Sequence, residues 1–262
     1  MMLGGLSLWN GMDRRSRVQR NSLNLTCKYL KVINKQEEWS ESMKLEAVIF
    51  DLDGVITDTA EYHYVAWKQL GESIGIPFDR DFNETLKGIS RGESLERILR
   101  LGGKENDYTE DEKAELARQK NEHYVSLLVN LTPADTYPGI VSLLTDLNAQ
   151  GIPAVIASAS KNAPQILRSL EIDNLFRYVV HPDSVKRGKP APDLFLRGAE
   201  EVGANPEHCV GIEDATAGVE AIKAAGMKAV GIGEAEALKA AGADIVLPNT
   251  SGLNVDLLNS LL

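Results

Sequence analysis

A pair of carboxylates near position 50 has the residue types and the spacing needed for phosphoryl transfer. Asp51 and Asp53 belong to the segment Asp51-Leu52-Asp53-Gly54-Val55, which directly follows an apolar run. Residues two apart in an extended chain point to the same side, and a turn at Gly54 would let Asp53 curl toward a reacting group. One carboxylate could then attack phosphorus while the other shuttles a hydroxyl proton. Alone, the pair is equally consistent with turn aspartates at the end of a strand.

A hydroxyl-rich segment forms the second candidate element. Ser158-Ala159-Ser160-Lys161-Asn162 also follows an apolar run and precedes a helical pattern. The Ser158 hydroxyl and the neighbouring backbone N–H groups could hold a phosphate at a helix N-terminus. The alternative is that the segment only caps the helix.

A lysine and a second acidic pair complete the set of candidates. Lys189 begins the stiff sequence KPAPD (189–193), and Glu213-Asp214 ends another apolar run before a glycine-containing helical pattern. A lysine can offset phosphate charge, and acidic oxygen ligands can hold magnesium. The alternatives are a solvated loop cation for Lys189 and a helix N-terminal cap for Glu213 and Asp214.

Short apolar runs precede three of these clusters and recur along the chain. They have the length and composition of buried parallel strands. The runs are 45–50, 153–157, 178–180, 209–212, 229–232 and 245–247. Helical patterns lie between them, one ending at Gly151 and another at Gly226. The alternation predicts an α/β fold with a Rossmann-like parallel-sheet core covered on both faces, in which ligands bind at the carboxyl ends of the strands.

One interval breaks this alternation. Residues 59–134 contain helical patterns but no comparable strand, which predicts an inserted helical cap domain. The catalytic core would then consist of residues 43–58 and 135–262. The two linkers, near residues 57–58 and 132–136, would act as hinges.

Composition and charge exclude several classes of protein. The chain has 262 residues, 43% of them hydrophobic, so it can bury a substantial core. No apolar stretch approaches the roughly 18 residues that cross a bilayer, and two cysteines provide neither a disulfide framework nor metal-ligand spacing. The net charge of −10 argues against a general nucleic-acid surface. We expect a cytoplasmic monomer that acts on a small molecule, with no membrane or nucleic-acid partner.

The first 42 residues differ from the rest of the chain. They carry seven basic and four acidic side chains, a net +3, so the remaining residues carry −13. They lack the sustained apolar segment of a secretory signal, and Met43 directly precedes the first strand-like run. We therefore predict that residues 1–42 are an N-terminal extension, either disordered or not native because the start is mis-assigned.

The order of the four polar clusters resembles that of a known superfamily. The clusters follow the order of an acidic pair, a hydroxyl, a lysine and a second acidic pair, and this order matches the four motifs of the haloacid dehalogenase-like superfamily. The resemblance spans residues 43–262. Four segments are also similar to its branch of hexose-phosphate mutases: DLDGVITDTAEYH (51–63), KGISRGES (87–94), ASASKN (157–162) and KPAPD (189–193). This implies interconversion of β-glucose 1-phosphate and glucose 6-phosphate through an aspartyl-phosphate and β-glucose 1,6-bisphosphate.

The resemblance also implies a role for individual residues. Asp51 would be the nucleophile and Asp53 the general acid and base. One Mg²⁺ ion would be held by Asp51, the Asp53 carbonyl and Asp214, with support from Glu213. Ser158 and Lys189 would bind the transferring phosphate, assisted by Asn162. Arg91 would bind the opposite, non-transferring phosphate, to which Lys120 and the backbone around Ser94 could contribute. Thr59 and His63 would link the arrival of substrate to closure.

Other interpretations of the same residues remain open from the sequence. Without the resemblance, His63 is consistent with a hydrogen-bonded residue on a packed helix, and Arg91 and Lys120 with solvated surface cations. The four core motifs also suit a phosphatase for a small phosphorylated metabolite, in which water replaces the sugar hydroxyl as acceptor. A phosphate sensor without turnover is a third hypothesis, which the intact Asp51 and Asp53 disfavour.

Overall fold

The six apolar runs form one parallel sheet in the computed structural model, which describes residues 44–262. The strand order is β3-β2-β1-β4-β5-β6. The strands are β1 (Ala47–Phe50), β2 (Ala154–Ile156), β3 (Tyr178–Val179), β4 (Cys209–Glu213), β5 (Lys228–Ile232) and β6 (Ile245–Leu247). Each predicted run therefore coincides with a strand to within two residues at either end, which confirms the parallel-sheet prediction.

Strand β1 lies at the point where the chain changes its direction of travel across the sheet. Its residue Ile49 pairs with Val155 of β2 on one side and with Gly211 of β4 on the other, both in parallel register. The connection after β1 leads toward β2 and β3, whereas β4, β5 and β6 are added on the opposite side. Open α/β sheets bind ligands at such a switch point, outside the carboxyl ends of the strands.

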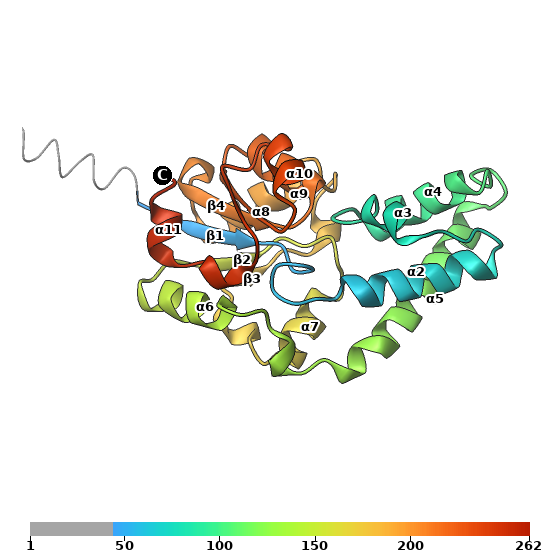
Figure 1. Cartoon of the computed structure of the whole chain (residues 1–262), viewed down its shortest axis with the longest axis horizontal. Helices are drawn as coiled ribbons and strands as arrows, with labels where there is room; N and C mark the ends of the chain where they lie inside the picture. The colour runs from blue at the N-terminus through green and yellow to red at the C-terminus, as the bar shows by residue number, and fades with distance from the viewer. Residues whose placement is uncertain (1–43) are drawn as a thin grey trace, which may run out of the picture. The chain divides into compact units, whose positions relative to one another are not determined.

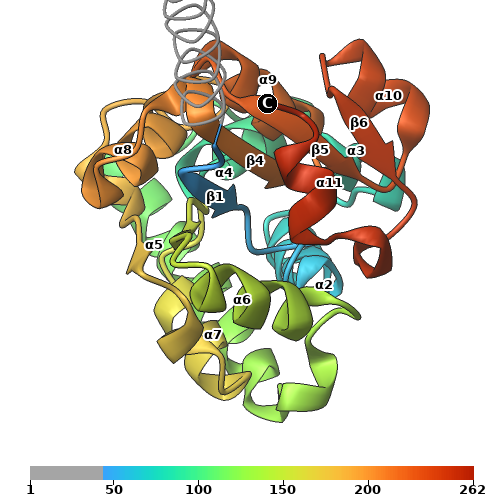
Figure 2. The same cartoon turned by 90° about the vertical axis from the view of Figure 1, so that its left-hand side faces the viewer.

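Helices cover both faces of this sheet (Figures 1 and 2). Val48 and Phe50 of β1 belong to one buried cluster, and Ala47 and Ile49 belong to another, because successive side chains of a strand point to opposite faces. Leucines of α6 pack in the first cluster, and Phe195 of α8 packs in the second. The core helices are α6 (Ile140–Ala149), α7 (Ala163–Ser169), α8 (Asp193–Val202), α9 (Thr216–Ala224), α10 (Ala235–Ala240) and α11 (Val255–Asn259).

Residues 59–134 fold into helices, as predicted for the insert. They form α2 (Ala60–Ser73), α3 (Arg80–Glu84), α4 (Arg91–Leu101) and α5 (Glu110–Leu127), which lie beyond the carboxyl end of β1 (Figure 1). Side-chain oxygens fix three of the helix starts: Asp79, Ser90 and Thr109 accept hydrogen bonds from backbone N–H groups three residues later. These helices bury a hydrophobic cluster of their own, around Trp67 and Ile98.

The two predicted linkers lie side by side. Thr57 forms an isolated bridge with Thr136, and its hydroxyl donates to the carbonyl of Asp135 at 2.8 Å. Leu45–Leu262 form one compact unit, so the division into core and cap remains a prediction. The prediction for residues 1–42 lies outside the described residues. Within the described part of the chain, no helix combines the length and the apolar character needed to cross a membrane.

The packing of α6 on the sheet predicts a specific loss of stability. Leu144 is fully buried against the sheet, whereas Leu196, on α8, is 38% exposed. Leu144→Ala should lower the free energy of unfolding by about 2–5 kcal/mol, because it removes buried methyl groups and leaves a cavity. Leu196→Ala, the matched control, should cost under about 1 kcal/mol. Urea denaturation measures both; equal losses would contradict this packing.

Candidate active site

Polar side chains from the carboxyl ends of β1, β2 and β4 meet residues of the helical insert around one cavity. Its volume is about 590 Å³, and both core and insert residues line it. The predicted site residues that line the cavity are Asp51, Asp53, His63, Arg91, Ser94, Lys120, Ser158, Asn162 and Asp214. The other three, Thr59, Lys189 and Glu213, are buried and bonded to residues of that set or to each other.

Lys189 lies between two carboxylates at the bottom of the site. Its Nζ donates to Asp51 Oδ1 at 2.5 Å and to Glu213 Oε1 at 2.6 Å, and its side chain is 0% exposed. Burial alone would lower the pKa of Lys189, but the two carboxylates hold it above its ordinary value. The interpretation of Lys189 as a solvated loop cation is therefore wrong.

Three carboxylates at the ends of β1 and β4 are arranged for a cation. Asp51, Glu213 and Asp214 each offer an oxygen, and these atoms lie within 4.8 Å of one another. Burial raises the pKa of Asp51 to about 6 against the opposing effect of Lys189, and burial followed by Glu213 raises that of Asp214 well above its usual range. Oxygen donors that repel one another in a buried site fit a hard cation such as Mg²⁺.

Asp214 does not cap the following helix. The residue before α9 is Ala215, which makes no side-chain cap, and its N–H donates to Glu213 Oε2 at 2.8 Å. Gly54 packs against the Asp214 carboxylate instead, since a Cβ at Gly54 would lie 2.2 Å from Asp214 Oδ2. The N-terminal cap interpretation is therefore wrong for Asp214, and Glu213 is the residue that binds the start of α9.

Asp53 lies next to this carboxylate cluster, and a hydroxyl and an imidazole lie close to its carboxyl group. The Thr59 hydroxyl donates to Asp53 Oδ1, and His63 Nε2 lies 3.9 Å from the same oxygen. A turn closed by the bond from the Ile56 N–H to the Leu52 carbonyl, 2.8 Å, bends the chain here as predicted. Burial, followed by the charge of Asp51, raises the pKa of Asp53 to about 7. A carboxyl group in this range can both donate and accept a proton near neutrality.

Lys120 reaches the site from α5 and is buried. Its Nζ lies 2.7 Å from His63 Nδ1 and sits over the rings of Trp67 and Tyr124, at 4.8 and 4.6 Å from their centroids. Burial, followed by the charge of Arg91, lowers the pKa of Lys120 to about 7. The surface-cation interpretation of Lys120 is therefore wrong, and His63 links this buried lysine to the side of the site where Asp53 lies.

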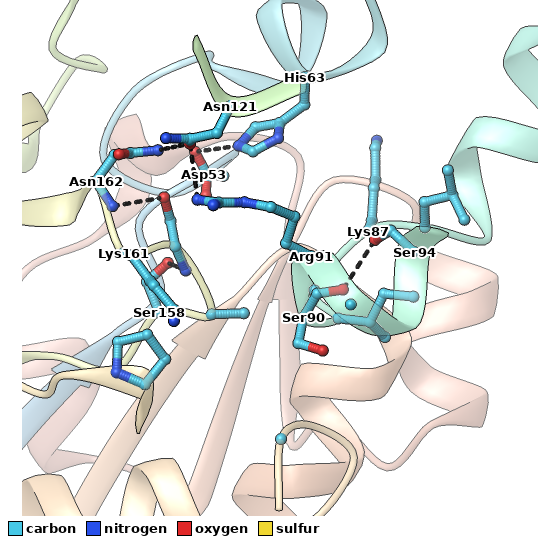
Figure 3. Close-up of a pocket in the computed structure, with 18 of the residues that line it drawn as sticks. Asp53, His63, Lys87, Ser90, Arg91, Ser94, Asn121, Ser158, Lys161 and Asn162 are labelled. Atoms are coloured by element: carbon cyan, nitrogen blue, oxygen red, sulfur yellow. Dashed lines mark hydrogen bonds and ion pairs between the residues drawn. The ribbon is translucent and has the colours of Figure 1, made fainter. Parts of the chain in front are cut away.

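An amide that the sequence did not single out joins the two sides of the cavity. Asn121 Oδ1 accepts one hydrogen bond from Arg91 Nη2 at 2.7 Å and another from Asn162 Nδ2 at 2.9 Å (Figure 3). The one available signal was its position next to Lys120 in the charged helix α5. Burial lowers the pKa of Arg91, which is about half-buried here.

Two predicted phosphate ligands make local bonds to their own segments. Ser158 is 1% exposed, and its Oγ accepts from the Ser160 N–H at 3.0 Å. The backbone N–H and the hydroxyl of Ser94 both donate to the Ser90 carbonyl. A contribution from the region of Ser94 would therefore come from the preceding amides in the first turn of α4.

Comparisons with known proteins place these residues in a family. Residues 45–226 match the model of the haloacid dehalogenase-like hydrolases. The chain is 54% identical to a β-phosphoglucomutase of Bacillus subtilis, covering 82% of this chain and 94% of that protein. It is 31% identical to a phosphorylated carbohydrates phosphatase of Thermotoga maritima, covering 80% and 98%. A crystal structure of β-phosphoglucomutase from Clostridium difficile superposes with a TM-score of 0.80 at 47% identity, covering 82% of this chain and 96% of that one.

The contact between Gly54 and Asp214 predicts a metal-binding defect. In Gly54→Ala the new methyl group would push the Asp214 carboxylate out of place, so the apparent Kd for Mg²⁺ should rise about tenfold or more. Gly103→Ala is the matched control, because Gly54 and Gly103 both have a positive φ (82° and 64°), but nothing lies within 4 Å of a Cβ added at Gly103. The rise in melting temperature with added Mg²⁺ measures binding. Equal rises in both variants would contradict the assignment of Asp214 to the metal site.

Proposed function

The chain belongs to the haloacid dehalogenase-like hydrolase family, and we infer that within it the chain acts as a β-phosphoglucomutase. The reaction interconverts β-D-glucose 1-phosphate and glucose 6-phosphate. The observation that carries this inference is a cavity shared by core and insert, with Asp51 on the core side and Arg91 on the insert side. A substrate or intermediate with a phosphate at each end has a charged partner on each side of that space.

The proposed nucleophile is the Asp51 carboxylate. Its Oδ1 already accepts from Lys189, which limits the repulsion that an incoming phosphoryl group would meet from the surrounding carboxylates. Asp51, Asp214 and the Asp53 carbonyl would hold Mg²⁺ with support from Glu213, and the bound ion would neutralise the oxygens of the phosphoryl group. Ser158, also buried at this edge, would donate a hydrogen bond from its hydroxyl to one of those oxygens.

Asp53 is the proposed general acid and base. Its carboxyl group would protonate the leaving sugar oxygen when Asp51 is phosphorylated, and remove the proton from the attacking sugar hydroxyl in the second transfer. The Thr59 hydroxyl holds Asp53 Oδ1, and His63 lies beside it and binds Lys120. We propose that Thr59 and His63 orient the Asp53 carboxyl and connect it to Lys120 of the insert.

Arg91 and Asn162 are the proposed ligands of the phosphate that is not being transferred. The sequence had indicated the transferring phosphate for Asn162, but its amide donates to the same Asn121 oxygen as Arg91 does. A guanidinium binds two phosphate oxygens at once, which water does not reproduce, so closure of the insert would depend on a second phosphate. Residues 59–134 would act as the cap that excludes water while β-glucose 1,6-bisphosphate reorients. A cytoplasmic, monomeric enzyme remains a prediction from the sequence.

Two products distinguish the mutase from a phosphatase. The enzyme is supplied with β-glucose 1-phosphate, Mg²⁺ and a trace of β-glucose 1,6-bisphosphate, and glucose 6-phosphate and inorganic phosphate are followed together. A mutase forms glucose 6-phosphate without net phosphate release. Release of phosphate in proportion to the substrate consumed would instead favour the activity named for the Thermotoga maritima relative.

Removing the nucleophile should abolish turnover in that assay. Asp51→Asn keeps the size of the side chain but gives an amide that cannot form the acyl phosphate, so kcat should fall by about 10⁴-fold or more. The melting temperature checks that the variant is folded. A folded Asp51→Asn enzyme that retains more than a few per cent of wild-type turnover would exclude Asp51 as nucleophile.

Removing Arg91 should impair binding of the non-transferring phosphate and leave phosphoryl transfer to Asp51 intact. In Arg91→Ala, kcat/KM for β-glucose 1-phosphate should fall roughly 10- to 100-fold, because charge-assisted hydrogen bonds to the second phosphate are lost. Phosphorylation of Asp51 by acetyl phosphate, which has only one phosphate, should persist. Arg100→Ala, an exposed arginine on the same helix, is the control. Unchanged mutase turnover in Arg91→Ala would reject this role for Arg91.

A further inference from the structure

One carbonyl oxygen connects the insert to the core inside the cavity. Asn121 Oδ1 accepts from Arg91 at the start of α4 and from Asn162 in the loop that follows β2 (Figure 3). Arg91 and Asn121 belong to the insert, and Asn162 belongs to the core. These two donors are the ones proposed above for the non-transferring phosphate. The Asn121 oxygen therefore receives the same two donors that a phosphate oxygen would.

The contact with Asn121 leaves Arg91 and Asn162 with N–H donors that can still bind a phosphate. A carbonyl oxygen has two lone pairs, and the two bonds use both of them. The Arg91 guanidinium gives one N–H group to Asn121 and keeps its others, and the Asn162 amide keeps its second N–H. Asn121 thus fixes the directions of both side chains without competing for all of their donors.

The neighbouring polar residues of α5 behave differently. Gln119 donates to Glu115 one turn earlier, and Arg118 bonds to Glu115 and Glu122, so both pair within their own helix. Gln119 is exposed and does not line the cavity. Asn121 instead lines the cavity and pairs across 30 and 41 residues of sequence. Asn121 therefore holds side chains of other segments, whereas the exposed Arg118 and Gln119 bond only to their own helix.

We propose that Asn121 is a positioning residue for the non-transferring phosphate of the sugar. It holds Arg91 of the insert and Asn162 of the core so that both face one phosphate group, which lowers the ordering cost of binding and of closure. This inference rests on the proposed mutase function. Asn121 itself acts through Arg91 and Asn162 and takes no part in the transfer at Asp51.

Replacement of Asn121 by alanine tests the proposal. In Asn121→Ala, KM for β-glucose 1-phosphate should rise about tenfold, the effect expected for the loss of hydrogen bonds that organise a charged ligand, while kcat changes less. Phosphorylation of Asp51 by acetyl phosphate should stay within about twofold of wild type. Gln119→Ala, an amide truncated on the exposed side of the same helix, should leave both rates unchanged. An unchanged KM, or a lower one, in Asn121→Ala would overturn the proposal.

A double variant separates positioning from a purely structural role. If Asn121 acts through Arg91 and Asn162, adding Asn121→Ala to Arg91→Ala should raise KM clearly less than Asn121→Ala does in the wild type, because one of the two side chains that it positions is already gone. Independent roles would instead give the product of the two effects. Multiplying effects would contradict positioning. Absence of isomerisation by the wild-type enzyme would instead reject the mutase function itself.

Discussion

The site depends on one interaction: a single buried lysine donates hydrogen bonds to two carboxylates at once. Lys189 donates to Asp51 and Glu213. The side chains of Lys189 and Glu213 are fully buried, and that of Asp51 is exposed only where it lines the cavity. Taking such charges out of water costs several kcal/mol per ion, and this cost is offset only if the charges are held in contact. The ends of β1 and β4 and the loop before α8 bring the three groups to one point. The sheet order, with β1 between β2 and β4, is the geometric condition for this arrangement.

The same edge carries more negative charge than Lys189 can balance. Asp51, Asp53, Glu213 and Asp214 gather there, and burial raises the pKa of three of them. This excess of negative charge has two consequences. The four carboxylates suit a divalent cation, and they would repel a phosphate unless further positive charges lay near the phosphate. The helical insert brings Arg91 and Lys120 to the cavity from the opposite side. Core and insert therefore contribute complementary charge to one reaction space.

Sequence patterns predicted the sheet well and the insert less completely. Strand positions followed from apolar runs, and Asp51, Ser158 and Glu213 followed from their places at strand ends, because a strand fixes the direction of the next few residues. Burial of Lys189 and Lys120 was not predictable from local pattern, since both lie against residues distant in sequence. The role of Asn121 was not predicted for the same reason. It depends on how α5 packs against α4 and against the loop after β2, which the local sequence does not determine.

Transfer of a labelled phosphoryl group in a single turnover tests the central claim most directly. The enzyme is labelled at Asp51 with ³²P from acetyl phosphate, freed of the donor, and mixed with β-glucose 1-phosphate and Mg²⁺. If the buried carboxylate passes its phosphoryl group to a sugar hydroxyl under the closed insert, the label should leave Asp51 and appear in hexose bisphosphate and hexose monophosphate. Label that appears as inorganic phosphate at the same rate with or without the sugar, or that never resided on Asp51, would contradict the account.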